Sequence, residues 1–273
     1  MDALTRWAGP AENHVYADTQ GNIGYQPAGL FPRRENFDGL LPVPGDGQYE
    51  WNGFFAINVL PSEFNPDRGF IATANAMTLP PDYPIDKYRI GFEWSSPWRQ
   101  RRIENVLQRQ RKHTLRNSIA LQHDYQSVFA EQMLKKIPRR LPNTIKEMFE
   151  GWDGGMDARS SSAAFFAIWY TRHLVPALIE TLFGSVTPIK SLSSSAVLEL
   201  MDNKAYDELV VTSLVITQIS FIPGASPFHM EAKFPSSNQS ENKLRIDWRS
   251  RAETTTGIWS YNAQFLSLSL IHI

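Results

Sequence analysis

The periodicity of the apolar residues changes once along this chain, at about Trp98. Before that point Gly, Pro, Asn and aromatic residues are frequent, and short apolar runs are separated by turn-forming residues. After it the apolar residues recur on one helix face, as Ile103, Val106 and Leu107 do within a charged segment. Strands followed by helices indicate the α+β class, because regular alternation of the two would instead predict a parallel sheet.

The first part of the chain predicts one hairpin and one buried strand. Residues 15–17 and 23–25 flank residues 18–22, where Gly21 and Asn22 tolerate a positive φ. The run 69–75 is short and mostly apolar, which is typical of a buried strand with Asn75 at its end.

The second part predicts three further helices. One apolar face recurs at i, i+3, i+4 and i+7: Ile145, Met148, Phe149 and Trp152. Asn143 or Thr144 is expected to cap this helix. A longer helix or helix pair is expected over 160–183, with a kink at Pro176 and an end at Gly184, and another over 207–219.

These patterns divide the chain into three parts. Residues 1–97 are interpreted as a β-rich part of one core, and residues 98–222 as a mainly helical segment of the same subunit. Residues 223–273 are left unassigned because the periodicity fades after Pro223. The last residues, 268–273, can be read as one frame of a transposon-derived sequencing adapter, so a frameshifted or foreign tail is expected.

Composition argues against several classes of partner. The 27 Lys and Arg balance 28 Asp and Glu, so neither nucleic acid nor an anionic membrane is expected as a partner. The chain has no Cys, which rules out disulfides, thiolate catalysis and cysteine–zinc sites. The most apolar stretch, 163–183, is interrupted by Arg172, His173 and Glu180, so it predicts a buried helix rather than a membrane span. The basic segment 99–116 is interpreted as a solvated helix face, with salt-sensitive DNA binding as the weaker alternative.

No complete catalytic constellation is present in the sequence, and only isolated polar residues suggest a site. A carboxamide N–H held at a strand end, as expected for Asn75, can stabilise an oxyanion by about 3 kcal/mol. Asn is also a common turn former, so this position alone does not decide between the two roles. Asp82 and Asp86 lie in a Pro-rich loop that could offer oxygens to a hard cation, although two carboxylates do not make a site.

Short motifs follow one another in a specific order between about residues 3 and 183. They are Tyr16-Ala17-Asp18, Gly21-Asn22-Ile23-Gly24-Tyr25, Leu41-Pro42-Val43-Pro44-Gly45, Tyr49-Glu50-Trp51 with Gly53, Asn65-Pro66, Gly69-Phe70-Ile71-Ala72-Thr73-Ala74-Asn75, Asp82-Tyr83-Pro84, Trp98-Arg99 with Arg102-Ile103, Gln122 with Asp124 and Ser127, and Trp152-Asp153-Gly154 with Met156. Each motif is weak singly, but the ordered series resembles an internal piece of the large subunit of the penicillin acylase family.

The resemblance implies an N-terminal nucleophile hydrolase with a four-layer αββα sandwich around two antiparallel sheets. In such an enzyme a precursor cleaves itself, and the new N-terminal serine attacks an amide with its own α-amino group as base. The implied substrates are β-lactam side-chain amides or N-acyl-homoserine lactones. The implied partners are the small-molecule amide, a small subunit and an upstream part of the large subunit, in a periplasmic or secreted protein.

The same resemblance assigns roles to four residues. Asn75 corresponds to the oxyanion-stabilising Asn, which we expect to be held at a sheet end and aimed into a cleft. Arg99 corresponds to the Arg that supports this site. For the family's structural calcium, Asp86 corresponds to a carboxylate ligand and Gly39 to a backbone carbonyl ligand.

The sequence also departs from the family. Ala76 stands where many members have a second Asn, and Arg159 stands where an Asp is usual. The nucleophilic serine and the other calcium ligands are expected upstream of this segment, so the chain alone is expected to be inactive. The alternative hypothesis is a non-catalytic aromatic-rich binding module. Buried aromatic rings favour the acylase, and a coplanar exposed row of rings would favour the module.

Overall fold

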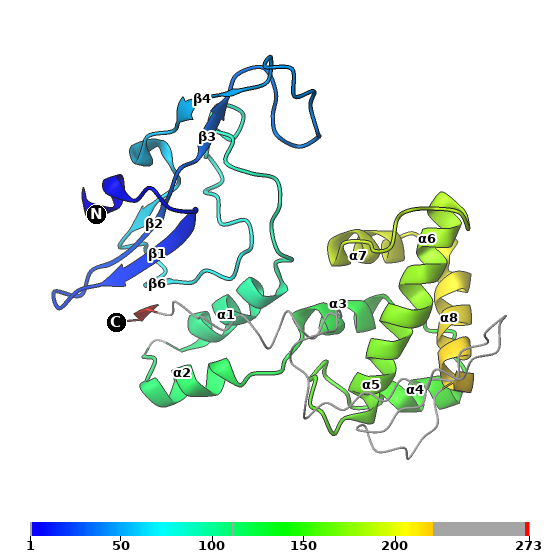
Figure 1. Cartoon of the computed structure of the whole chain (residues 1–273). Coiled ribbons are helices and arrows are strands. Elements are labelled where there is room, and N and C mark those ends of the chain that lie inside the picture. Colours follow the sequence, from blue (N-terminus) through cyan, green and yellow to red (C-terminus); the bar gives the residue numbers. More distant parts are fainter. Residues whose placement is uncertain (1, 111, 221–270, 273) are drawn as a thin grey trace, which may run out of the picture. The chain divides into compact units, whose positions relative to one another are not determined.

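The computed structural model describes residues 2–110, 112–220 and 271–272 (Figure 1). The chain divides into two compact units, Met1–His123 with Ser267–Ile273, and Asp124–Leu266. Helices begin at Trp98, where the sequence pattern changes, whereas the packing units divide after His123. The hypothesis of a foreign or frameshifted tail over 223–273 falls almost entirely outside the described residues.

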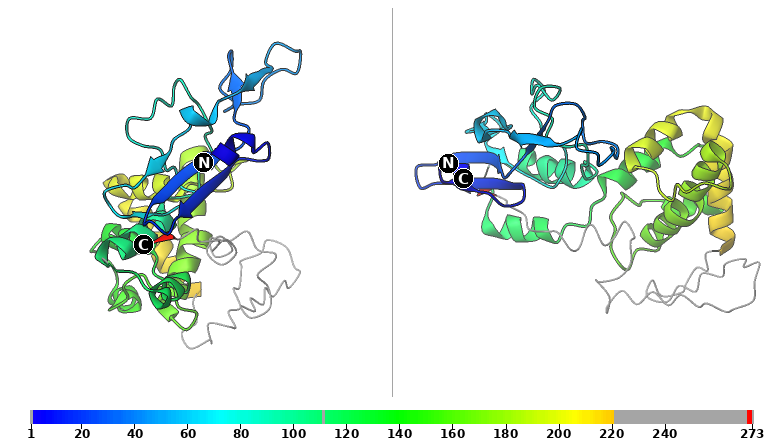
Figure 2. Two further views of the ribbon diagram at one scale, coloured as in Figure 1. Left: turned by 90° about the vertical axis from the view of Figure 1, so that its left-hand side faces the viewer. Right: turned by 45° about the horizontal axis from the view of Figure 1, so that its top comes forward.

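The first unit is built on a three-stranded antiparallel sheet in the order β1-β2-β5. Strands β1 (Glu12–Ala17) and β2 (Ile23–Ala28) form the predicted hairpin and run side by side as a ribbon in Figure 2. Strand β5 (Glu63–Phe64) pairs with β2. In the hairpin loop the Asp18 carboxylate accepts from the backbone N–H groups of Gln20 and Asn22, both at 2.9 Å.

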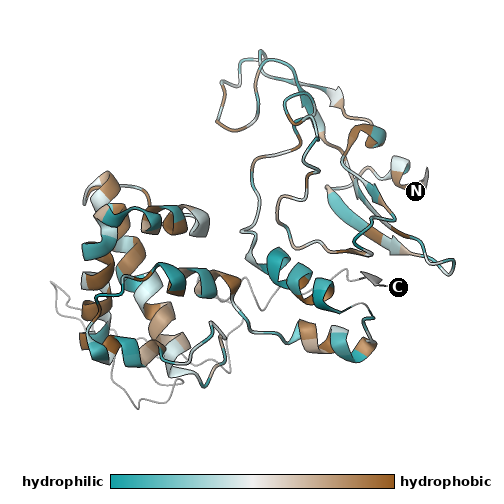
Figure 3. Ribbon diagram, turned by 180° about the vertical axis from the view of Figure 1, so that it is seen from behind, coloured by the Kyte–Doolittle hydropathy of each residue, from teal (hydrophilic) through white to brown (hydrophobic). Residues whose placement is uncertain are grey.

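Shorter elements surround this sheet. Strands β3 (Pro32–Arg34) and β4 (Trp51–Phe54) pair with a register shift, and β6 (Phe70–Ile71) pairs with β7 (Ile271–His272). Two 3₁₀ turns, η1 (Asp2–Arg6) and η2 (Ile57–Val59), and helices α1 (Trp98–Arg109) and α2 (Leu115–Gln122) complete the unit. Figure 3 colours most of α1 as hydrophilic; of its arginines, Arg101 and Arg109 are exposed, whereas Arg99 and Arg102 are partly buried.

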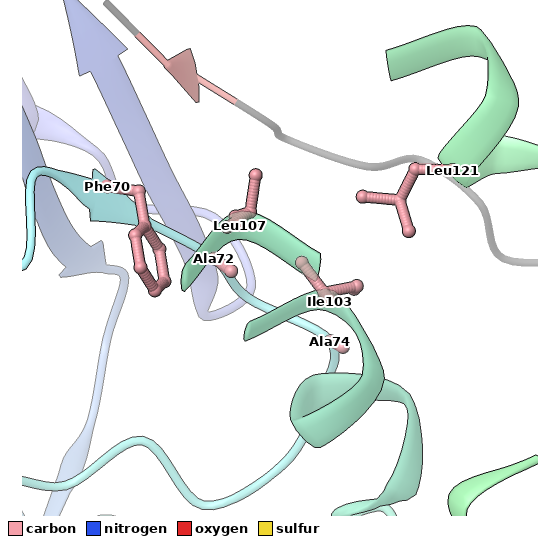
Figure 4. Packing of buried hydrophobic residues seen from close by; sticks show 6 residues of the cluster. All are labelled: Phe70, Ala72, Ala74, Ile103, Leu107 and Leu121. Carbon is pink, nitrogen blue, oxygen red and sulfur yellow. The ribbon is translucent and has the colours of Figure 1, made fainter. Parts of the chain in front are cut away.

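Strand β6 separates two small hydrophobic clusters. Phe70 packs with Ala72, Ala74 and residues of α1 and α2, namely Ile103, Leu107 and Leu121 (Figure 4). Its neighbour Ile71 packs with Ile23 and Tyr25 of the sheet. Because successive strand side chains point to opposite faces, these two residues join the sheet to the helical layer.

The buried strand that we predicted over 69–75 is shorter than expected. It ends at Ile71, although Ala72 and Ala74 remain buried. The prediction was wrong beyond Ile71 because the carbonyl groups of Ala72 and Ala74 accept from side chains of α1 rather than from a neighbouring strand.

The described part of the second unit is helical apart from its loops. Its elements are α3 (Val128–Lys136), α4 (Asn143–Phe149), α5 (Ser161–Ile168), the π-helical segment η3 (Trp169–Leu174), α6 (Val175–Phe183), α7 (Ser194–Asp202), the 3₁₀ turn η4 (Lys204–Tyr206) and α8 (Asp207–Ser220). Gly184 ends α6 with φ 81°, as predicted. Pro176 lies in the first turn of α6, directly after the π-helical segment, so the disturbance expected at this proline takes the form of a π-helical insertion.

Two details of α4 differ from the prediction. Pro142 rather than Asn143 or Thr144 occupies the N-cap position, and the helix ends before Trp152. Trp152 nevertheless stacks on Phe149, with ring centroids 5.9 Å apart, because a tight turn returns it to the helix.

Aromatic side chains form the centre of the second unit. Phe165, Phe166, Trp169 and Tyr170 are buried with Phe129, and the Trp169 indole N–H donates to Ser213 at 2.9 Å. Within the described ranges, no helix combines the length and the apolar character that crossing a membrane would require.

Candidate active site

Asn75 lies four residues beyond β6, at a bend that starts the loop toward α1. Its φ of 60° places it in the left-handed region, which Asn tolerates better than most residues. The backbone N–H of Ser95 donates to the Asn75 carbonyl at 2.8 Å and closes the base of the loop. The side chain itself is exposed, whereas we expected it to face into a cleft.

Arg99, in the first turn of α1, fixes the direction of the Asn75 carboxamide. Its Nη2 donates to Asn75 Oδ1 at 2.9 Å and to the Ala74 carbonyl at 3.0 Å. An arginine can only donate, so the oxygen of the carboxamide must face it and the NH₂ group must face away. Among the described residues Asn75 Nδ2 has no hydrogen-bond acceptor, so its N–H groups are available to donate to a bound molecule.

Partial burial affects the electrostatics of this pair. Desolvation lowers the pKa of Arg99 from its ordinary value, although a guanidinium stays charged at neutral pH. A positive charge therefore lies next to the carboxamide oxygen of Asn75.

Asn65 provides an internal comparison for Asn75. It also has a positive φ, 47°. Its Oδ1 accepts from the backbone of Ile23 at 2.9 Å and its Nδ2 donates to Asn22 at 2.8 Å. Both ends of the Asn65 carboxamide are thus engaged in holding the hairpin, whereas Asn75 keeps its donor unengaged.

Sequence reasoning did not single out Gln100, which follows Arg99. This residue is buried, and its Nε2 donates to the Ala72 carbonyl at 2.8 Å. Gln100, Ile103 and Leu107 are the buried residues of α1. A polar residue within an otherwise apolar helix stripe is the signal that could have identified it.

The residues predicted to bind calcium lie among cations. Asp86 and Gly39 belong to neighbouring loops, and Asp86 lines a small hollow with Arg34, Phe37, Asp38, Phe55, Lys87 and Arg89. Arg89 lies between two carboxylates, 3.6 Å from Asp38 and 3.5 Å from Asp86. Gly39 lies against the Arg34 side chain. A Cβ added at position 39 would lie 2.7 Å from Arg34 Nε.

These residues do not by themselves fit calcium. The ion takes six to eight oxygen ligands, and the part of the chain that the structure describes contains no group of three His, Cys, Asp or Glu suited to a metal. The Asp86 side chain is 98% exposed and faces the Arg89 guanidinium, which already supplies a positive charge between the two loops.

The aromatic rings bear on the alternative of a binding module. Among the residues that the structure describes, the largest ring cluster is buried in the second unit, as the acylase hypothesis expects. The exposed pair Trp51 and Phe54 is edge-to-face, with an interplanar angle of 69°, rather than coplanar.

Comparison with known proteins identifies the family. The family model for penicillin amidase matches residues 1–254, and the chain belongs to this family. The acyl-homoserine lactone acylase QuiP of Pseudomonas syringae pv. tomato is 31% identical over 196 residues, which cover 64% of this chain and 23% of that protein. The penicillin G acylase of Escherichia coli is 36% identical over 103 residues, which cover 37% of this chain and 12% of that protein. The chain therefore spans less than a quarter of these relatives.

A solved structure supports the fold assignment. The thermostable penicillin G acylase from Alcaligenes faecalis matches with a TM-score of 0.58 and 20% identity, over 80% of this chain and 47% of that chain. The mixed helices and antiparallel sheets thus form part of the penicillin acylase fold, an N-terminal nucleophile hydrolase fold, as the ordered motifs predicted.

Proposed function

We propose that this chain supplies the oxyanion-stabilising part of an acylase that hydrolyses amide bonds by acyl transfer. The observation that carries the proposal is the Asn75 carboxamide, which Arg99 holds by its oxygen so that its N–H₂ faces outward. Membership of the penicillin amidase family supports the reaction class.

In the proposed reaction a serine upstream of this segment, in the whole protein, attacks the substrate carbonyl. The α-amino group of that N-terminal serine accepts the hydroxyl proton. Asn75 Nδ2–H donates to the carbonyl oxygen as it becomes an oxyanion, and Arg99 keeps this donor in place while its charge favours the negative oxygen. The proton then passes to the leaving amine, and water releases the acyl group by the reverse sequence of steps.

N-acyl-homoserine lactones are the substrate class that we favour, with β-lactam side-chain amides as the second. What supports this choice is the longer aligned stretch shared with the QuiP acylase, 196 residues against 103 for the penicillin G acylase. A small subunit, the remaining part of the large subunit and a periplasmic or secreted location belong to the same proposal for the whole protein.

A chimeric enzyme tests the proposal. The aligned segment of the P. syringae QuiP acylase is replaced by the corresponding segment of this chain, and hydrolysis of an N-acyl-homoserine lactone and of a chromogenic phenylacetyl amide is measured. We expect the chimera to turn over at least one substrate, and Asn75→Ala to lower kcat by about 10²- to 10³-fold. Asn65→Ala is the matched control, expected to affect stability but not kcat, because both ends of that carboxamide serve the hairpin.

Besides a folded and processed chimera that turns over neither substrate, two results would contradict the proposal. One is a chimera that folds and processes itself but in which Asn75→Ala retains full kcat. The other is saturable hydrolysis by the 273-residue chain alone, which would require a nucleophile within it.

A further inference from the structure

Gln100 occupies a place on α1 where an apolar residue would ordinarily lie. It is 8% exposed and shares the buried face of the helix with Ile103 and Leu107. Burying a carboxamide costs free energy unless its polar atoms form hydrogen bonds. The hydrogen bonds of Gln100 therefore indicate its structural role.

Both N–H groups of the Gln100 carboxamide are engaged. Nε2 donates to the Ala72 carbonyl and to Glu104 Oε1, each at 2.8 Å. A backbone carbonyl accepts only, as does an ionised carboxylate, so a flipped amide would bring its oxygen against two acceptors. The orientation of the amide is therefore decided by its surroundings.

The other end of the carboxamide has no partner among the described residues. Gln100 Oε1 is buried and receives no hydrogen bond there. A methionine of similar shape would avoid this unsatisfied acceptor, so the residue contributes through its donors rather than through general packing.

Gln100 and Arg99 together hold the segment that carries Asn75. Arg99 bonds the carbonyl of Ala74 and Gln100 bonds the carbonyl of Ala72. Two consecutive α1 side chains thus supply the hydrogen-bond donors that a partner strand would otherwise provide to these carbonyl groups. The segment is therefore held at Ala74 and at Ala72, one and three residues before Asn75, in addition to the contact of Arg99 with Asn75 Oδ1.

We infer that Gln100 is a positioning residue for the proposed oxyanion donor, acting through the Ala72 carbonyl on the loop that presents Asn75. The inference rests on the proposed function. Gln100 touches neither substrate nor reacting atoms; it limits the movement of the Ala72–Asn75 segment, and with it the place of Asn75 Nδ2.

The first test measures the segment itself, without activity. Amide hydrogen exchange of residues 72–76 is compared in the 273-residue chain and its Gln100→Met and Gln108→Met variants. Gln108 lies exposed on the same helix, so its variant controls for the change in side chain. We expect faster exchange over 72–76 in Gln100→Met alone; equal exchange in all three proteins would overturn the inference.

The second test uses the chimeric acylase described above. Gln100→Met is expected to lower kcat about tenfold with KM within twofold of the parent, because a misplaced donor weakens only transition-state binding. Gln108→Met is expected to leave both constants unchanged. A parent-like kcat in a folded Gln100→Met chimera would overturn the inference.

Gln100→Glu supplies a readout that a purely structural role would not produce. At neutral pH its carboxylate has no donor for Ala72 and faces Glu104, and burial with a like charge raises its pKa. Protonation restores one O–H donor, so activity relative to the parent at the same pH should rise as the pH falls. A ratio that does not change with pH would count against the inference even if Gln100→Met failed to fold.

The failures of the two proposals remain distinguishable. An inactive but folded and processed parent chimera would contradict the proposed function, while the exchange experiment would still decide whether Gln100 holds the segment. An active parent with unchanged Gln100 variants would contradict the positioning role alone.

Discussion

The guanidinium of Arg99 donates to the carboxamide oxygen of Asn75 over 2.9 Å, and this single contact decides which end of the amide faces outward. The left-handed backbone at Asn75 and the Ser95 hydrogen bond to its carbonyl keep the residue at the bend. Under the proposed function the Asn75 N–H₂ group would thus be oriented before substrate binds, which is the condition under which a hydrogen bond contributes most to catalysis.

Glycine and alanine at position 75 should separate the backbone role of Asn75 from its chemical role. Both variants lack the carboxamide, so both should lose the proposed oxyanion stabilisation. Only alanine is strained at a φ of 60°, so Asn75→Ala should be less stable than Asn75→Gly by about 1 kcal/mol. Thermal or urea unfolding of the two variants measures the difference. Equal stabilities would mean that the left-handed backbone is not maintained.

Replacement of Arg99 should impair the proposed chemistry without removing the oxyanion donor. Arg99→Met frees the Asn75 carboxamide to rotate, and we expect kcat of the chimera to fall by about 10- to 100-fold with little change in KM. Arg99→Lys should retain part of the activity, because an ammonium donates but cannot grip two oxygens with a planar fork. If Arg99→Met raised only KM, the guanidinium would serve substrate binding instead.

Calcium should have little effect on the stability of this chain. Millimolar calcium or a chelator should leave the Tm of the 273-residue chain unchanged, with magnesium at matched ionic strength as the control. Arg89→Gln removes the cation between Asp38 and Asp86 and should make the chain more responsive to calcium than the parent. Saturable stabilisation of the parent by calcium, abolished by Asp86→Asn, would restore Asp86 and Gly39 as ligands.

Local patterns predicted the hairpin and several helices, but not helices α2, α3 and α7 or the contacts of the candidate site. The hairpin and the start of α1 follow from turn residues and helical spacing, which are local properties. The end of β6 at Ile71 does not follow from a local pattern. It depends on Gln100, which lies 28 residues farther along the chain and donates to the Ala72 carbonyl. Only the return of the loop 76–97 brings α1 against this segment.

The same distinction applies to the individual site residues. Asn75 and Arg99 were predicted from a resemblance, and the structure places them in contact, but their catalytic role stays a prediction. Nothing in the sequence around Asn75 indicates that its oxygen rather than its nitrogen faces Arg99. The basic surroundings of Asp86, in contrast, can be read from the sequence, because Lys87 and Arg89 lie within three residues after it.

The π-helical segment of the second unit holds a tyrosine whose ionisation should couple to folding. Tyr170 packs against Phe129, with ring centroids 4.9 Å apart, and is stacked on Phe166 at an interplanar angle of 9°. Burial in this apolar cluster raises the pKa of Tyr170 from 10.0 to about 12.

A raised tyrosine pKa stabilises the fold only while the hydroxyl remains neutral in the unfolded chain. The contribution is fully present below pH 10 and is lost as the pH rises from 10 to about 12, since the unfolded state releases its proton first. The two-unit difference corresponds to about 2–3 kcal/mol. Urea unfolding at intervals from pH 9 to 12 should therefore show a fall in stability that is smaller in Tyr170→Phe than in the parent. Tyr125→Phe, at an exposed position of the same unit, is the control and should retain the full fall; parallel profiles for the parent and Tyr170→Phe would show that the Tyr170 hydroxyl is not buried in the folded protein.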